Sequence, residues 1–411
     1  MIGFTNAKVF NTIEYNKDYE NNNSNVYKIT IVDYDGSIID AQNLIKGQQY
    51  TLPPNPYHEG LVFQEWSSSE TIVDGKITIP DNNVMVGAIY TTTSDKNEID
   101  IELTTTTGLV VTLNMNGTKD WGDGTSDTTT THTYSQIGKY TIKCDGTTIT
   151  PTSSTSGLFG QSSTNKNGYT LNVRLATITE IANYSFAYCY CLKTITLSNR
   201  VSNIKDSSFR DSVALKGLII PYGITKILGY VFQNLRACSV IVIPKTVTEI
   251  RGNSFYANWS LKTIVFPDSI TTFSNKNNFD GCYSLKEIII PNSVTSIDSN
   301  YIFANTFTLE KVIILTDSIT SIPGYAFYQC YCLRSLKIPK TITTIGANAF
   351  YYCYSLLEYD FSQHTSVPTL SNTNAFTRIN SACKIKVPNS LLSQWKAATN
   401  WSTYADYIVG V

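Results

Sequence analysis

Charge of either sign is scarce in this chain. Only 15% of the 411 residues are Asp, Glu, Lys or Arg, and the formal net charge is -1. A chain without an excess of basic residues has no positive field to hold a phosphate backbone, which argues against nucleic acid as a partner. No run of about eighteen apolar residues is present, so no segment is expected to insert into a membrane as a helix.

Ligands for a metal or a cofactor are also few. The histidines are His58, His132 and His364. Two close cysteine pairs are separated by one residue, not by the two residues of a zinc or redox C-x-x-C motif: Cys189 with Cys191, and Cys330 with Cys332. We therefore expect no bound metal and no cofactor.

Motifs of catalysis are missing as well. The sequence has no GxSxG elbow, no HExxH helix, no phosphate-binding Walker loop and no dinucleotide glycine fingerprint. Its carboxylates are scattered, and nothing in their spacing pairs them for glycoside hydrolysis. The chain is therefore expected not to be an enzyme.

What the sequence does contain is a periodic array of phenylalanines. Successive members are 23 or 24 residues apart: Phe186, Phe209, Phe232, Phe255, Phe279, Phe303, Phe327 and Phe350. A period in the twenties with leucines at fixed offsets is typical of a leucine-rich solenoid, in which each unit buries its apolar face against its neighbours. Four cysteines fall three residues after a repeat Phe, where we expect free thiols in the solenoid core. The odd total of nine is consistent with synthesis in a reducing compartment.

Each repeat Phe lies in the same local pattern. An apolar residue precedes it by five or six positions, usually a leucine follows at six, and an apolar pair follows at nine and eleven, such as Ile288 and Ile290. That alternation predicts one short strand per repeat, with two residues pointing inward and one outward. Proline often follows at offset twelve, where it ends the strand without removing a ladder hydrogen bond.

Residues 345–356 (IGANAFYYCYSL) and 285–291 (LKEIIIP) carry a family resemblance. Their pattern resembles the BspA-like, or Treponema-type, leucine-rich repeat family, over about residues 165–390. Members of that family are mostly surface, secreted or phage-encoded adhesion proteins, so the resemblance implies binding and not catalysis. It names no ligand, because one fold can serve many functions.

The region before the array differs in texture. Residues 27–32 (YKITIV), the turn DYDG at 33–36, three nearby prolines and the GLVFQEW stretch ending at Trp66 resemble a Listeria-Bacteroides, or internalin-B-type, repeat. That resemblance implies a small β-grasp-like module. The usual tyrosine of the family's GY pair is Leu61 here.

A second resemblance lies between residues 97 and 150. WGDG at 121–124, HTY at 132–134 and GKYTI at 138–142 resemble, in that order, a PKD domain, an immunoglobulin-like β-sandwich. An Asp-Gly pair suits a tight hairpin turn, Tyr134 resembles a corner tyrosine, and Trp121 offers a large core side chain. The alternative is that Asp120, Asp123 and Asp127 gather a calcium ion, although most such turns are only turns.

These patterns predict a mainly β, multidomain chain. The expected parts are a docking or flexible segment (1–25), a β-grasp-like module (26–94), a PKD-like immunoglobulin-type sandwich (95–150), and a leucine-rich repeat solenoid with a C-terminal cap (151–411). The length agrees with two to three domains of ordinary size.

The first twenty residues show neither a basic start nor an apolar core with a cleavage site, and so do not resemble a secretion signal. The carboxyl end carries no sorting signal. We expect either a trimmed chain or, preferably, a protein that is made in the cytoplasm and leaves the cell in a phage particle. In that case residues 1–25 would dock to the virion; the alternative is a frayed terminus.

Two columns of side chains are candidate binding surfaces. Four residues after the repeat Phe stands an aromatic column: Tyr190, Trp259, Tyr283, Phe307, Tyr331 and Tyr354. Ten residues after it, at the outward strand position, stands an apolar stripe: Ile219, Val242, Val265, Ile289 and Ile313. An exposed stripe of this kind usually marks an interface. The competing interpretation of both columns is packing between neighbouring repeats.

The resulting hypothesis is a non-catalytic, adhesin-type binding protein of a virion or an extracellular surface. In the preferred form it is a phage receptor-binding or decoration protein that recognises a host-surface glycan or protein, with the two β modules acting as a stalk. The alternatives are a bacterial cell-surface adhesion protein and a purely structural component whose partners are other virion proteins.

Overall fold

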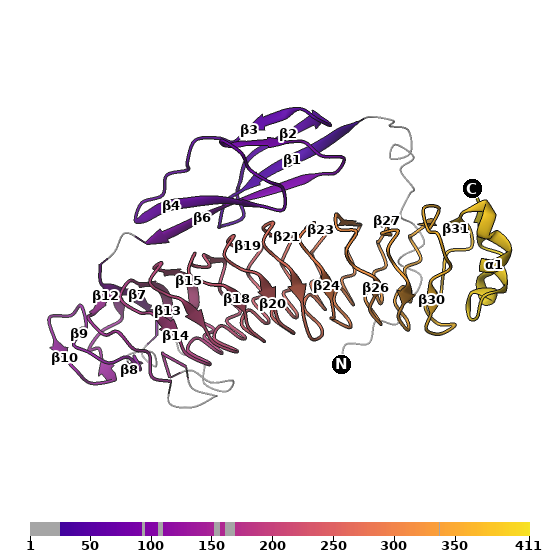
Figure 1. The fold of residues 1–411 in the computed structure, drawn as a ribbon. Coiled ribbons are helices and arrows are strands. Elements are labelled where there is room, and N and C mark those ends of the chain that lie inside the picture. The colour runs from indigo at the N-terminus through magenta and orange to yellow at the C-terminus, as the bar shows by residue number, and fades with distance from the viewer. Residues whose placement is uncertain (1–24, 93–94, 106–109, 152–156, 161–168, 337) are drawn as a thin grey trace.

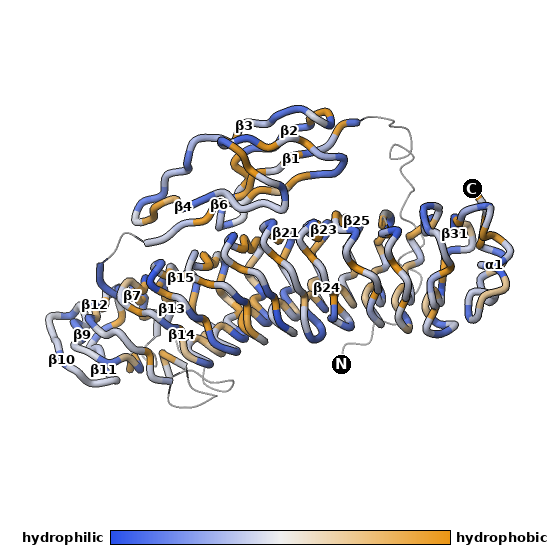
Figure 2. The backbone as a smooth tube through the Cα atoms, in the orientation of Figure 1, coloured by the Kyte–Doolittle hydropathy of each residue, from blue (hydrophilic) through white to orange (hydrophobic). Residues whose placement is uncertain are grey.

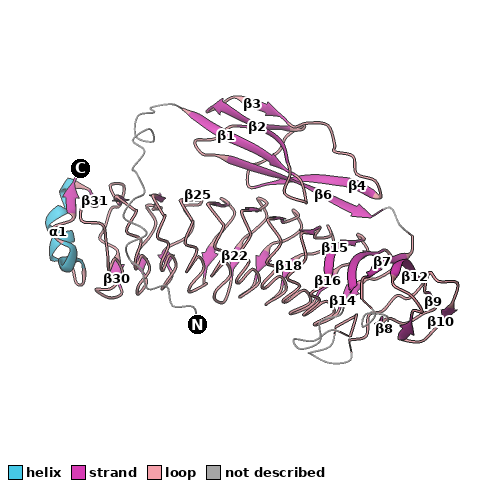
Figure 3. Cartoon of the chain, turned by 180° about the vertical axis from the view of Figure 1, so that it is seen from behind, coloured by secondary structure: helices cyan, strands magenta, loops and turns pink. Residues whose placement is uncertain are grey.

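The computed structural model describes residues 25–92, 95–105, 110–151, 157–160, 169–336 and 338–411. The described chain forms a long rod of stacked turns, and a smaller β module lies along one side of that rod (Figure 1). Strands and loops make up almost all of it, and helix is confined to the carboxyl end (Figure 3). The predicted mainly β composition is therefore confirmed.

The first module comprises residues 26–92. Its strands are β1 (Val26–Val32), β2 (Ile38–Ile45), β3 (Gln49–Thr51), β4 (Leu61–Ser68), β5 (Lys76–Thr78) and β6 (Val84–Thr92). The main sheet has the order β2-β1-β6-β4, in which β1 and β6 run parallel and the outer strands are antiparallel to them. Its core includes Trp66 and Tyr90.

The next segment carries six short strands at one end of the rod. They are β7 (Asn97–Leu103), β8 (Val110–Thr112), β9 (Lys119–Asp120), β10 (Ser126–Asp127), β11 (Thr131–Thr133) and β12 (Gly138–Cys144). Strand β7 pairs antiparallel with β13 (Tyr169–Leu175), the first long strand of the array. The hydrogen-bonded sheet thus continues past residues 150 and 151, and its apolar core is continuous with that of the rod.

The rod is a parallel β-solenoid with two strands per repeat. The nine strands of one face are β15 (Leu192–Leu197), β17 (Gly217–Leu218), β19 (Val240–Val242), β21 (Thr263–Val265), β23 (Glu287–Ile290), β25 (Lys311–Ile314), β27 (Ser335–Leu336), β29 (Glu358–Asp360) and β31 (Lys384–Val387). The two-residue strands of the other are β14 (Glu180–Ile181), β16 (Asn203–Ile204), β18 (Lys226–Ile227), β20 (Glu249–Ile250), β22 (Thr272–Phe273), β24 (Ser296–Ile297), β26 (Ser321–Ile322), β28 (Thr344–Ile345) and β30 (Thr369–Leu370). Apolar residues of both faces fill one core, which confirms the predicted solenoid. Apolar and polar stretches alternate along the backbone of successive turns (Figure 2).

The repeat phenylalanines form a continuous stack inside the rod. Neighbouring rings from Phe186 to Phe350, and on to Phe376, have centroids 5.0 to 5.8 Å apart and nearly parallel planes. Each ring is 3% exposed or less. Because each member stacks on the phenylalanine of the repeat before and of the repeat after it, the stack couples neighbouring repeats and not distant ones.

A second ladder accounts for three of the cysteines. In five repeats the side chain three residues after the Phe donates to the carbonyl oxygen of the preceding repeat's Phe, as from Ser212 to Phe186 and from Cys282 to Phe255. Thr306, Cys330 and Cys353 repeat that contact. A small donor satisfies the buried carbonyl at this position, so the thiol of Cys and the hydroxyl groups of Ser and Thr can replace one another. All nine cysteines are free.

The turn around each Phe is tight because two residues adopt left-handed backbone. Tyr230 and Asn234 flank Phe232 with φ of 60° and 59°, and Asn253 and Ala257 flank Phe255 with 59° each. The sequence contains glycine at only one such place, Gly281. Non-glycine residues in this region carry strain, which the surrounding stack must offset.

The carboxyl end closes the rod. After β31 follow η3 (Asn389–Leu391), α1 (Leu392–Ala397), η4 (Trp401–Tyr404) and β32 (Ile408–Gly410), and β32 pairs with β31. Trp395 and Trp401 are fully buried against Phe361 and Phe376. This cap covers the last repeat, whose open face would otherwise be solvated.

Candidate functional site

Five members of the aromatic column form an uninterrupted ladder on the edge of the rod. We call Trp259, Tyr283, Phe307, Tyr331 and Tyr354 the aromatic ladder. Neighbouring ring centroids in it are 5.0 to 5.8 Å apart, with planes inclined by 4° to 26°. The spacing follows from the rise between parallel strands of adjacent repeats.

The ladder offers ring edges to solvent, because its ring faces are used internally. Each inner ring is stacked on both sides, and the guanidinium carbon of Arg236 lies 3.9 Å from the centroid of the terminal Trp259. Trp259 and Tyr283 are 40% and 37% exposed, and the other three rings are half-buried. A flat ligand therefore finds edges and hydroxyl groups here, not a row of open faces.

Tyr190, the sixth predicted member, lies apart from this ladder. The two intervening repeats carry Val213 and Arg236 at the same position, so no aromatic ring links Tyr190 to Trp259. Its ring packs near Tyr188 instead, at 6.5 Å. The structure thus brings together five of the six predicted residues.

A group of tyrosines that the sequence analysis did not single out widens the ladder. Tyr301 stacks on Tyr325 at 4.4 Å, and Tyr328 stacks on Tyr351 at 5.3 Å. The group joins the ladder where Tyr352 meets Tyr331 edge to face. The sequence could have indicated this group, because Tyr301 and Tyr325 both stand two residues before a repeat Phe, and Tyr328 and Tyr351 both stand one residue after it.

Charged or titratable side chains that lie near these rings include Arg236 against Trp259, Arg378 over Tyr352 at 5.8 Å, and Asp280. Asp280 is mostly buried and accepts a hydrogen bond from Asn305 at 2.8 Å, and burial raises the pKa of its carboxyl to about 6. Burial also raises the pKa of Tyr331 to about 12, with neighbouring tyrosines adding to the shift. The Tyr331 phenol therefore remains a neutral hydrogen-bonding group at physiological pH.

The predicted apolar stripe is covered, and the expectation that it is exposed is wrong for four of its five members. Ile219, Val242, Val265 and Ile289 are between 1% and 5% exposed, whereas Ile313, beyond them, is half-buried. The first module lies on this face of the rod (Figure 1). The stripe thus forms an interface inside the chain, and the module is not held out as a stalk.

Strand β6 makes that contact because both of its faces are apolar. Val84, Val86 and Ala88 point into the module's own core, while Met85 and Ile89 pack against Val240, Val242 and Val265. Between them Gly87 leaves room for Val242: a β-carbon there would lie 2.5 Å from the valine γ carbons. The residue at 87 thus decides how closely the two surfaces approach.

Hydrogen bonds surround this apolar contact. The Ser67 hydroxyl donates to the Ile243 carbonyl, and the Asn83 amide donates to Glu287 at 3.1 Å. A bulge in β4 at Gln64 turns both Gln64 and Glu65 toward the rod. Gln64 accepts from Asn199 at 2.7 Å, and Glu65 accepts from the Lys245 backbone amide at 3.0 Å.

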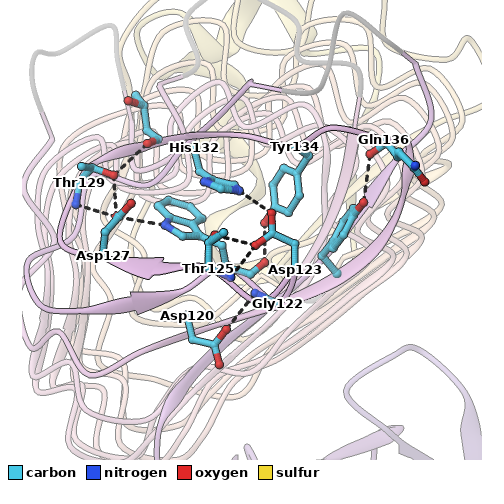
Figure 4. Close-up of polar contacts among 12 residues, drawn as sticks. Asp120, Gly122, Asp123, Thr125, Asp127, Thr129, His132, Tyr134 and Gln136 are labelled. Carbon is cyan, nitrogen blue, oxygen red and sulfur yellow. Dashed lines mark hydrogen bonds and ion pairs between the residues drawn. The ribbon is translucent and has the colours of Figure 1, made fainter.

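The acidic turn segment uses its carboxylates locally. Asp123 accepts from the amide and hydroxyl of Thr125 and lies 2.8 Å from the His132 ring nitrogen; Asp127 accepts from the Trp121 indole at 3.1 Å (Figure 4). Asp120 accepts from the Gly122 amide. These are turn contacts. Across the described part of the chain, no group of three or more His, Cys, Asp or Glu side chains is placed to hold a metal.

Asp33 and His58 of the first module form a pair whose contacts are to residues of the same module. Asp33 accepts from the Tyr90 hydroxyl at 2.8 Å and lies 2.7 Å from the His58 ring nitrogen, and Tyr34 packs edge-on to both rings. These contacts anchor the DYDG turn to the module core.

Among the residues that the structure describes, no helix is long and apolar enough to cross a membrane.

The fold and its ladders define a leucine-rich-repeat type of solenoid. Residues 165–277 and 299–398 match the BspA type leucine rich repeat region, in six copies, and these ranges exceed half of the chain. The chain therefore belongs to the BspA type leucine-rich repeat family.

Similar solved structures come from bacteria. A leucine-rich repeat protein from Bacteroides ovatus is 18% identical with a TM-score of 0.40, covering 58% of this chain and 76% of that one. The T. pallidum leucine-rich repeat protein is 24% identical with a TM-score of 0.32, covering 44% and 76%. A leucine-rich cell surface protein from Faecalibacterium prausnitzii is 22% identical with a TM-score of 0.32, covering 55% and 76%. No curated protein matches the chain.

Proposed function

We propose that this chain is a non-catalytic, adhesin-type binding protein that contacts its partner through the aromatic ladder. Membership of the leucine-rich repeat family supports a scaffold role, because stacked repeats create extended surfaces on which binding residues are displayed. The observation that carries the proposal is the ladder itself, five stacked rings from five consecutive repeats, of which Trp259 and Tyr283 are 40% and 37% exposed.

Of the two ligand classes that the sequence left open, a protein partner is favoured over a glycan. Sugar rings bind aromatic side chains by stacking on an open ring face, whereas the inner faces of the ladder are occupied by neighbouring rings. Ring edges with outward hydroxyl groups suit the mixed apolar and polar surface of a protein. Arg236 and Arg378, which lie over Trp259 and Tyr352, add positive charge to that surface.

The finer assignments remain proposals. The parallel central pair β1 and β6 supports a β-grasp-like first module, and the hydrogen bond from the Tyr134 hydroxyl to the Trp121 carbonyl supports a PKD-like second segment (Figure 4). The virion hypothesis depends on residues 1–25, of which 1–24 lie outside the described residues. Mass spectrometry of purified particles tests it directly.

The test of the ladder is a double substitution, Trp259→Ala with Tyr283→Ala. If the ladder binds, affinity for cells or for a captured surface protein falls by about 2 kcal/mol or more, as expected for aromatic hot spots. Tyr222→Ala is the matched control, since Tyr222 is an exposed aromatic of the rod outside the ladder. Equal affinity of the double variant and the control would remove the ladder from the binding site.

A further inference from the structure

The contact between the first module and the rod contains an excess of carboxyl groups. Glu65, on the bulged strand β4, is half-buried in it and accepts one hydrogen bond, from the Lys245 amide. Glu70 follows at the same edge, and one of its carboxyl oxygens is buried without a hydrogen-bond partner among the described residues. No ion pair reaches either glutamate in the described part of the chain.

The charged groups that face these two glutamates are mostly of the same sign. Lys245 of the rod attracts Glu65, whereas Asp268 of the rod repels both Glu65 and Glu70. Asp81 of the module also repels Glu70. Lys46 lies 3.5 Å from Asp81, so that carboxylate is ion-paired within the module. Lys245 thus remains to compensate Glu65, Glu70 and Asp268 beside a boundary whose centre is apolar, so ionised glutamates are poorly compensated there.

We propose that the first module is a pH-responsive cover of the apolar stripe, held more tightly when Glu65 and Glu70 are protonated and more weakly when they ionise. The cover and the stripe meet through Met85, Ile89 and Gly87 on one side and Val242 and Val265 on the other. Loosening this contact exposes the apolar stripe of the rod to solvent.

The direction follows from the carboxyl groups. Burial raises the pKa of Glu65, the amide and charge of Lys245 lower it in part, and Asp268 raises it again. Burial raises the pKa of Glu70, and Asp81 and Asp268 add to the shift. In the released module both return toward the ordinary value of 4.5. Docking therefore takes up protons, and it weakens as the pH rises from about 4.5 through the higher pKa values of the docked state.

Amide hydrogen exchange of the full chain measures how tightly the first module is docked on the rod. The amides of Asn199 and Lys245 in the rod donate to Thr91 and Glu65 of the module, so they report docking directly. After correction for the intrinsic rate, both are expected to exchange about threefold or more faster at pH 8 than at pH 5. In the double variant Glu65→Gln with Glu70→Gln that difference is lost, because glutamine keeps the acceptor for Lys245 and carries no charge. Strand β28, far from the module, reports the stability of the rod.

Asp268→Asn supplies an independent variant outside the module. Asp268 is exposed, so its replacement removes a repelling charge without disturbing a core, and protection of the Asn199 and Lys245 amides at pH 8 should rise. Asp317→Asn, at an exposed position paired with Lys340, is the matched control and should leave the protection of those two amides unchanged. Equal wild-type protection at both pH values, or an undiminished pH response in the double glutamine variant, overturns the proposal. It does not depend on the aromatic ladder.

Discussion

Gly87 and Val242 lie 155 positions apart in the sequence and in contact in the fold. A β-carbon on Gly87 would lie 2.5 Å from both valine γ carbons. The backbone of Gly87 does not have a positive φ, so its conformation is one that any residue can adopt. The glycine is therefore required by the approach of the module to the rod and not by its own turn geometry.

Replacing Gly87 by Val should open this interface. The module's own core lies on the other face of β6, so the module is expected to stay folded while the stripe becomes exposed and binds an environment-sensitive apolar dye. Gly138→Ala is the control, because a β-carbon there meets only Tyr140, at 3.6 Å or more. Unchanged dye binding together with native exchange rates in β19 would contradict the steric argument.

The phenylalanine stack should behave as a chain of neighbour contacts. Phe255→Ala removes a fully buried ring stacked on Phe232 and Phe279, and should lower the free energy of unfolding by about 3 to 5 kcal/mol. The loss of exchange protection should be greatest in the adjacent repeats. Denaturant unfolding with peptide-resolved exchange measures both effects. A uniform loss extending to the residue 26–92 module would argue against nearest-neighbour coupling.

Asp280 should make the rod less stable as its carboxyl ionises. Burial holds the folded-state pKa at about 6, above the ordinary 3.8, so the folded state binds the proton more tightly than the unfolded state. Its contribution is therefore lost as the pH rises from about 4 to 6. Asp280→Asn keeps the acceptor for Asn305 and should raise the melting temperature above pH 6 while leaving it unchanged near pH 3.5. A constant difference at all pH values would point to packing instead.

His364 should produce the opposite dependence. Its ring is buried beside Phe361 and Trp395, and neither nitrogen has a hydrogen-bond partner among the described residues. Burial lowers its pKa below 6.5, although nearby backbone groups and Asp360 raise it in part. The unfolded chain takes up a proton that the folded cap resists, so stability falls as the pH drops below about 6.5. His364→Leu should retain more stability at pH 5 than the wild type. Thermal melts of both at pH 5 and 8 measure this, and equal acid sensitivity would exclude His364 as its source.

Much of the rod was predictable because its determinants are local. The Phe period, the alternating strand residues and the following proline all act within one repeat, and stacking identical units then places like residues in columns. The same logic predicted the aromatic column, but not its orientation. Whether rings meet by their faces or lie open depends on side-chain angles that neighbouring repeats impose, as between Tyr283 and Phe307.

Local pattern alone thus determined the solenoid, its buried phenylalanines and its free cysteines, since each follows from contacts within a repeat or with the next one. Tertiary structure decided what covers the stripe, because that contact joins residues far apart and depends on the shape of a whole module. One signal was present in the uninterrupted apolar run VMVGAIY at 84–90, which is typical of a strand buried on both faces. It showed that β6 needed a second neighbour, but only the folded chain showed that the neighbour is the face built around Val242.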